Sequence, residues 1–419
     1  MNESLQQRMR VRPKRSTRRV PHRLVEYAYY ASLFSSVFGG VVGFSIPFMI
    51  GGMILVLSIY CIFLNRSSVR EVYGPIGALF ACAFFFVLVQ VVVHEESPSG
   101  DDIRPFITWI LGVIVVHSLG WRRQFTHRFA IVLFVIGVIA LPFLELNADD
   151  RARVQMEGSG LGNPNGLGAW FGFCATYFSI RGLESKRGIG RTFSWLIAIG
   201  CVFVVGLTVS RGALLATALA ITVAFRRALK RAFVPLLVLM ILAGVLYESG
   251  LLERISSGYA ERGMEETGRG LIWPGIVERI FSSPVVPLVG VGSADVETHV
   301  VGAFQGRPMV PHNSFLYFAL SSGVVPLAFY VAFWIQAVWK SFSPTKKLQD
   351  AAFRLPFLLY TFVVVMLGDY DYMSPWAILA LTVGAGSGFF DRTPHRVARS
   401  IPSRSLQQSQ AGIQVKESI

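Results

Sequence analysis

Residues 73–93 read YGPIGALFACAFFFVLVQVVV, an uninterrupted apolar run without a charged side chain that decides the fold. A helix of about 20 apolar residues is long enough to cross the ~30 Å hydrocarbon core of a bilayer. Similar runs recur along the 419 residues, of which 53% are hydrophobic and only 15% charged. Because a soluble chain carries roughly 25% charged residues, the sequence predicts a polytopic integral membrane protein.

We predict an all-α membrane bundle of about twelve spanning helices joined by short charged or Gly/Pro-containing connections. Their approximate bounds are 25–43, 46–64, 73–93, 103–120, 129–146, 166–181, 192–209, 211–225, 232–248, 314–338, 353–369 and 375–391. Because the connection between the first two runs is very short, a count of about eleven helices is the alternative. The four cysteines lie inside apolar runs without CxxC spacing, so we expect packing residues rather than disulfides or a zinc site.

Charge sets the expected orientation. Lys and Arg concentrate in alternate connections and in both termini, which places both termini in the cytoplasm by the positive-inside rule. We therefore divide the chain into a basic cytoplasmic tail (1–24), a membrane domain (25–391) and a disordered cytoplasmic tail (392–419). The formal net charge of +14 is dispersed over many loops, so we expect contact with membrane lipids and no nucleic-acid partner.

One connection, about 249–312, is long and external in this topology. Within it, residues 273–282 have the pattern of a short amphipathic helix, suited to the membrane interface or to plugging a cavity. Arg269 precedes this helix between two glycines, where the backbone approaches a ligand closely and the helix N-terminus favours an anion. His312, at the end of the connection, is either structural or a general base near neutral pH.

Arg211 lies in an outer hinge of very few residues between two apolar helices. Its guanidinium either extends to lipid headgroups or binds an anion at a fixed position. His299 competes with His312 as a base but has no comparable neighbourhood. The sequence Asp369-Tyr370-Asp371 matches a short metal-binding pattern of glycosyltransferases, but acidic outer turns are expected from topology. We expect no metal ion and no cofactor.

Four segments occur in an order that resembles the O-antigen ligase and polymerase family of bacterial membrane glycosyltransferases. They are SRG (210–212), GRGLIW (268–273), PLVGVG (287–292) and PHNSFL (311–316), within about residues 195–335. The upstream segment GLGNPNGLG (160–168) also looks like the Asn-Leu segment of this family. The resemblance implies a GT-C-like helical bundle in the bacterial plasma membrane, with its site facing the periplasm.

By this resemblance, His312 is the general base, and Arg211 and Arg269 bind the diphosphate of an undecaprenyl-diphosphate-linked glycan donor. Further substrate-binding candidates are Arg151, Arg153, Asn165 and Asn313. The acceptor is lipid A-core in a ligase of lipopolysaccharide biosynthesis, or a growing glycan in a polymerase of O-antigen or exopolysaccharide. The implied reaction is an inverting, metal-independent transfer. Two other function classes stay open: a solute transporter of the same broad family, and a non-catalytic scaffold of cell-envelope assembly.

Overall fold

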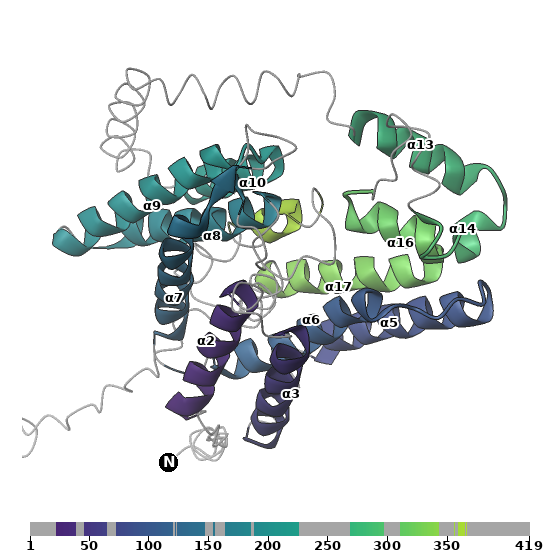
Figure 1. Cartoon of the computed structure of the whole chain (residues 1–419), viewed down its shortest axis with the longest axis horizontal. Coiled ribbons are helices and arrows are strands. Elements are labelled where there is room, and N and C mark those ends of the chain that lie inside the picture. Colours follow the sequence, from purple (N-terminus) through teal and green to yellow (C-terminus); the bar gives the residue numbers. More distant parts are fainter. Residues whose placement is uncertain are drawn as a thin grey trace, which may run out of the picture.

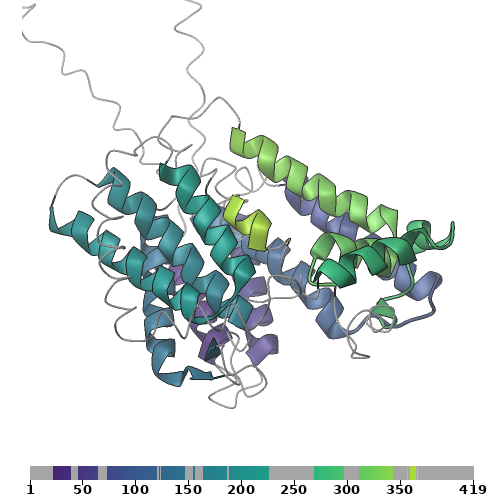
Figure 2. The ribbon, with the colours of Figure 1, turned by 90° about the horizontal axis from the view of Figure 1, so that it is seen from above.

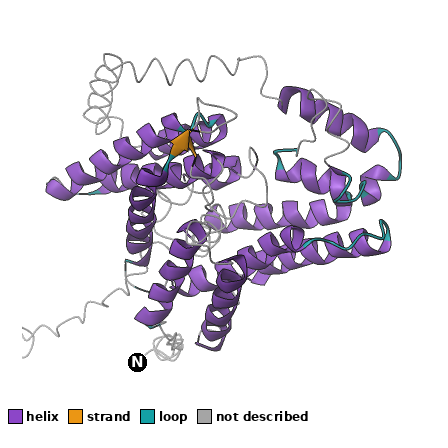
Figure 3. Cartoon of the chain, in the orientation of Figure 1, coloured by secondary structure: helices purple, strands orange, loops and turns teal. Residues whose placement is uncertain are grey.

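The computed structural model describes residues 22–38, 46–64, 73–119, 122, 124–146, 154–155, 164–185, 188–225, 269–296, 311–342, 356, 359–364 and 366. These residues are mostly helical, as predicted (Figure 3). Two strands of two residues each, β1 (Glu145–Leu146) and β2 (Val154–Gln155), pair antiparallel. The predicted spans 232–248 and 375–391 lie outside the described residues, as do residues 1–21 of the basic tail and the whole C-terminal tail.

The bounds of most described helices follow the apolar runs of the sequence. The helices are α2 (Arg23–Phe38), α3 (Ile46–Leu64), α5 (Tyr73–Val92), α6 (Gly100–Leu119), α7 (Phe125–Ala140), a short 3-10 turn η2 (Leu141–Phe143), α8 (Pro164–Glu184), α9 (Ile189–Leu207), α10 (Arg211–Phe225), α13 (Arg269–Phe281), α14 (Val286–Val289), α16 (Ser314–Ser322) and α17 (Val324–Phe342).

Three helical stretches among the described residues are long and apolar enough to cross a membrane: Tyr73–Val92, Phe125–Phe143 and Ile189–Leu207. Four shorter apolar stretches accompany them, in α3, α6, α10 and α17. A membrane protein is thus supported at this coarser level. The count of about twelve spans and the side of each terminus remain predictions.

The helices form two groups, one of α7–α10 and one of α5, α6, α13, α14, α16 and α17 (Figures 1 and 2). Helices α2 and α3 connect them, since α2 packs on α7 and α3 while α3 packs on α6. The helices do not share one direction. In Figure 1, α2, α3 and α7 run across the direction of α8, α9 and α17.

The predicted span 314–338 is not one helix, because it breaks at Gly323 into α16 and α17. Gly323 has a φ of 77°, in the left-handed region that favours glycine. A Cβ at this position would overlap the carbonyl of Leu288. The Pro/Gly-rich segment before residue 293 therefore lies in the break between α16 and α17. The backbone of this segment approaches that of Gly323 so closely that position 323 requires glycine.

A cluster of aromatic side chains holds the second group together. The fully buried rings of Phe86, Phe106, Phe318 and Tyr330 come from α5, α6, α16 and α17. The centroid of Phe318 lies 6.2 Å from Phe86, 5.6 Å from Phe106 and 4.8 Å from Tyr330. Such separations are typical of favourable aromatic pairs, so α16 is packed against α5, one of the three candidate spanning helices.

In the first group, α8 approaches α10 closely through small residues. A Cβ at Gly168 would lie 2.9 Å from both Ala213 Cβ and Thr208 Oγ1, and one at Gly172 would overlap Thr217 and Tyr360. This spacing of four residues is the small-residue pattern of membrane helix packing. It brings the N-terminal ends of α8 and α10 together. The four cysteines are buried and unbridged, as expected.

Candidate functional site

Two of the segments that carry the family resemblance meet where α8 and α10 begin. The Ser210 hydroxyl donates a hydrogen bond of 2.8 Å to the side-chain oxygen of Asn165, and Ser210 is 1% exposed. Ser210 Oγ also accepts from the backbone N–H of Ala213 at 3.4 Å, which makes Ser210 the N-cap of α10. Arg211 is therefore the first residue of α10, at the helix end that favours anions.

The backbone before Arg211 is strained. Val209 has a φ of 48°, which is a genuine outlier for a β-branched residue. The N–H of Val209 donates to the carbonyl of Gly206 at 3.0 Å, so the end of α9 holds the turn. Such strain persists only where the surrounding structure fixes it, and it is concentrated at functional sites.

His312 has the same kind of backbone, with a φ of 49°, and its side chain is partly exposed. On one side of it, the carbonyl of Pro311 accepts a hydrogen bond of 3.0 Å from the indole of Trp273. On the other, the Asn313 side-chain oxygen accepts from the N–H groups of Phe315 and Leu316 at 2.9 and 3.2 Å. Asn313 is thus the N-cap of α16, and His312 is fixed between two anchored neighbours.

Arg269 is the first residue of α13, so the predicted short helix is present and begins one turn earlier than expected. Trp273, one turn further along α13, makes the contact to Pro311. The segments GRGLIW and PHNSFL are therefore joined by a hydrogen bond, just as SRG and GLGNPNGLG are. Four other candidates, Arg151, Arg153, His299 and the Asp369–Asp371 motif, lie outside the described residues.

A short helical segment, 359–364, contacts both pairs of motifs. The Tyr360 hydroxyl donates to the carbonyl of Ala169, one turn after Asn165. The Phe362 ring lies 6.1 Å from that of Phe315, three residues after His312. In Figure 2 this yellow-green segment lies between the teal helices α8–α10 and the light green α17. Sequence reasoning did not single out either aromatic residue, since each lies in an ordinary apolar run.

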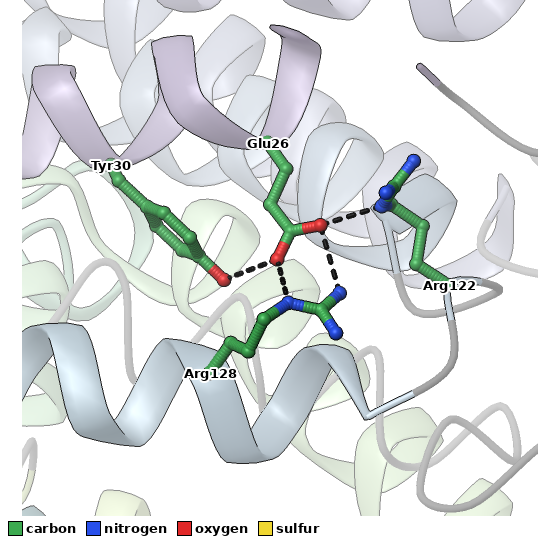
Figure 4. A network of polar contacts seen from close by, with 4 residues as sticks. All are labelled: Glu26, Tyr30, Arg122 and Arg128. Atoms are coloured by element: carbon green, nitrogen blue, oxygen red, sulfur yellow. Dashed lines mark hydrogen bonds and ion pairs between the residues drawn. The ribbon is translucent and has the colours of Figure 1, made fainter. Parts of the chain in front are cut away.

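Sequence reasoning also missed a polar network on α2 (Figure 4). The Glu26 carboxylate is 2% exposed and accepts hydrogen bonds from Arg122 Nε at 2.5 Å, from Arg128 Nε and Nη2 at 2.6 and 2.9 Å, and from Tyr30 at 2.7 Å. The acid ties α2 to the α6–α7 connection through Arg122 and to α7 through Arg128, which indicates a structural role. A lone acid directly after a basic tail was the signal that could have found it.

In the described part of the chain, no group of three or more His, Cys, Asp or Glu side chains could hold a metal ion. Comparison with models of known protein families gives no match, and neither does comparison with curated protein sequences.

Proposed function

We propose that the protein is a membrane glycosyltransferase of the O-antigen ligase/polymerase type. It transfers an oligosaccharide from a lipid-diphosphate carrier to lipid A-core or to a growing polysaccharide on the outer face of the bacterial plasma membrane. The observation that supports the proposal is the pairing of the resembling segments. Ser210 bonds to Asn165, and Trp273 bonds to Pro311, so the two motifs of each pair, 45 and 38 positions apart in sequence, lie together.

The chemistry of these residues fits such a transfer. The acceptor hydroxyl oxygen attacks the anomeric carbon, the bond from that carbon to the phosphate oxygen breaks, and the electron pair leaves with the lipid diphosphate. The imidazole of His312 takes the hydroxyl proton. Arg211 and Arg269 stabilise the charge that develops on the diphosphate, for which the planar guanidinium fork is well suited. A single displacement inverts the anomeric centre, and with two arginines at the phosphates no metal ion is needed.

The test compares His312 variants that preserve the backbone. Because His312 has a positive φ, alanine would disturb the turn as well as remove the base, whereas asparagine and glycine tolerate this conformation. We expect His312→Asn to lower transfer from a lipid-diphosphate glycan by about 10²-fold or more without changing membrane abundance. In His312→Gly, added imidazole should restore part of the activity. Released lipid diphosphate and product are measured in EDTA.

Arg211 is tested in the same assay. Arg211→Lys keeps the charge but loses the bidentate fork, and Arg211→Gln loses both, so turnover should fall in that order, by about 10²-fold or more for the glutamine variant. A His312→Asn protein with full activity would remove His312 from the mechanism. Activity that disappears in EDTA and returns with a divalent ion would contradict metal independence.

A solute carrier is the second candidate, and the broken helix α16–α17 favours it, because carriers bind ions at the ends of discontinuous helices. Here the carbonyls at the break are already engaged: those of Leu320 and Ser321 accept from Val291 and Gly292 at 2.8 and 3.2 Å. Because these carbonyls already accept hydrogen bonds from the backbone, they are less suited to coordinate a transported ion, which supports the enzyme over the carrier. Solute exchange across proteoliposomes without any released lipid diphosphate would reverse this preference.

A further inference from the structure

The C-terminal end of α5 contacts the end of α16 and the segment that enters the break between α16 and α17. Gln90 is fully buried, and its amide N–H₂ donates to the carbonyl of Ser321 at 3.0 Å and the hydroxyl of Ser322 at 3.1 Å. Its side-chain oxygen accepts from the backbone N–H of Ser293 at 2.7 Å. One amide therefore joins three elements: α5, the end of α16, and the segment that enters the break.

We define that segment, residues 288–294, as the strap. Further contacts hold it to the residues that follow α5. Glu96 accepts from the backbone N–H of Ala294 at 3.2 Å and the hydroxyl of Ser293 at 3.4 Å. The His94 imidazole is 2.8 Å from the carbonyl of Val289. The strap is thus bound along its length by side chains from the end of α5 and from the residues that follow it.

The strap in turn fixes the position of α16. Its N–H groups at Val291 and Gly292 bond to carbonyls in the last turn of α16. Helix α16 has only nine residues, a length that is marginal without tertiary contacts. Its other end is the Asn313 cap next to His312. One short helix therefore connects the strap to the residue next to the imidazole.

From this geometry we infer that Gln90 and Glu96 are positioning residues of the active site, acting through the strap and α16 on His312. The inference rests on the proposed function. These two residues do not carry the reaction themselves. They hold the base at the acceptor oxygen, where a misplacement of about 1 Å can lower turnover by about 10²-fold.

A double-mutant cycle tests this coupling. Gln90→Leu keeps a buried side chain of similar size but loses all three hydrogen bonds, and we expect kcat to fall by about 10-fold or more with little change in donor KM. If Gln90 acts through His312, the same substitution in a His312→Gly background should have almost no further effect. A purely structural role predicts equal factors in both backgrounds, and that additive result would overturn the inference.

Conservative and matched variants complete the design. Glu96→Gln keeps an acceptor for Ala294 and should retain most of the activity, whereas Glu96→Ala should resemble Gln90→Leu. Glu95 is exposed and directly adjacent, so Glu95→Gln is the control. It should leave both kcat and the hydrogen-exchange rates of the strap amides unchanged. Loss of activity in Glu95→Gln equal to that of Glu96→Ala would contradict a specific role for Glu96.

Hydrogen exchange separates failure of this inference from failure of the proposed function. The amides of Val291, Gly292, Ser293 and Ala294 should exchange at least about 10-fold faster in Gln90→Leu than in the wild type, because their acceptors are lost or displaced. This result does not require transfer. If exchange is faster in Gln90→Leu as expected but the wild type transfers no glycan, the proposed function is refuted, and with it the role of Gln90 and Glu96 in catalysis. Unchanged exchange in Gln90→Leu refutes the strap contact itself.

Discussion

At the residue scale, Glu26 carries an interaction that is expensive to break. Its carboxylate is 2% exposed and faces Arg122 and Arg128, whose side chains are 14% and 39% exposed. Glu26→Ala leaves two cations facing each other. We expect it to cost roughly 1–3 kcal/mol of stability, less than the ~3–5 of a fully buried pair because Arg128 retains water. The unfolding midpoint in detergent measures this loss.

Two variants give the scale for that prediction. Tyr30→Phe removes only the 2.7 Å hydrogen bond to Glu26 and should cost about 1 kcal/mol. Glu278→Gln changes an exposed acid of α13 and should leave the midpoint unchanged. A Glu26→Ala protein as stable as Glu278→Gln would show that the network adds nothing to stability.

The sequence predicted functional roles for two asparagines but did not predict their contacts. Asn165 and Asn313 were predicted to bind substrate because of their motifs. In the structure, the oxygen of Asn165 accepts from Ser210 and that of Asn313 caps α16. Substrate binding by either remains a prediction. Capping could have been predicted, since Asn before an apolar run is a helix-start signal. The bond to Ser210 could not, because it joins residues 45 positions apart.

At the element scale, the break between α16 and α17 makes Gly323 intolerant of a side chain. Gly323→Ala would place a Cβ against the Leu288 carbonyl and force alanine to a φ of 77° and a ψ of −165°, a conformation adopted almost only by glycine that costs about 1–3 kcal/mol for the backbone alone. We expect lower thermal stability and displacement of the strap. Gly77, inside α5, has open space around a Cβ. Gly77→Ala is therefore the matched control and should be neutral or stabilising, by up to about 1 kcal/mol.

Thermal unfolding together with exchange of the strap amides decides between these outcomes. If Gly323→Ala unfolds and exchanges like Gly77→Ala, the break is not a fixed feature and α16–α17 can form one helix. The apolar pattern alone predicts that single helix, since residues 314–338 contain no charged side chain. The bonds from the strap to the α16 carbonyls and from Gln90 to Ser321 and Ser322 distinguish the broken form, and they come from segments far away in the sequence.

At the scale of the whole molecule, helix type was predictable, and so were the bounds of some long apolar runs, whereas the break at Gly323 and the arrangement of the helices were not. The run 73–93 corresponds to α5 (Tyr73–Val92) and the run 211–225 to α10, because long apolar periods fix a helix locally. The contact between the two pairs of motifs passes through Tyr360 and Phe362, and no local pattern encodes it. The spacing of Gly168 and Gly172, by contrast, could have indicated the close approach of α8 to another helix.

The orientation of the whole molecule is tested at two connections between helices. Ser97 is exposed and lies next to Glu96, which contacts the strap. Ser185 directly follows α8, whose 21 residues extend about 32 Å from the end that holds Asn165. If the candidate site faces outward, Ser97 should therefore be outside and Ser185 inside.

The four native cysteines are at most 1% exposed, and thiol labelling requires access as well as the thiolate, so they should give little background. In intact cells, a membrane-impermeant maleimide should label Ser97→Cys, whereas Ser185→Cys should be labelled only after permeabilisation. The reverse labelling pattern would show that the topology is the opposite of the predicted one and that His312 lies on the cytoplasmic side. Labelling of both variants in intact cells would mean that α8 does not separate two compartments. Either outcome would end the proposal of glycan transfer at the outer face, whatever the activity of His312 variants in detergent.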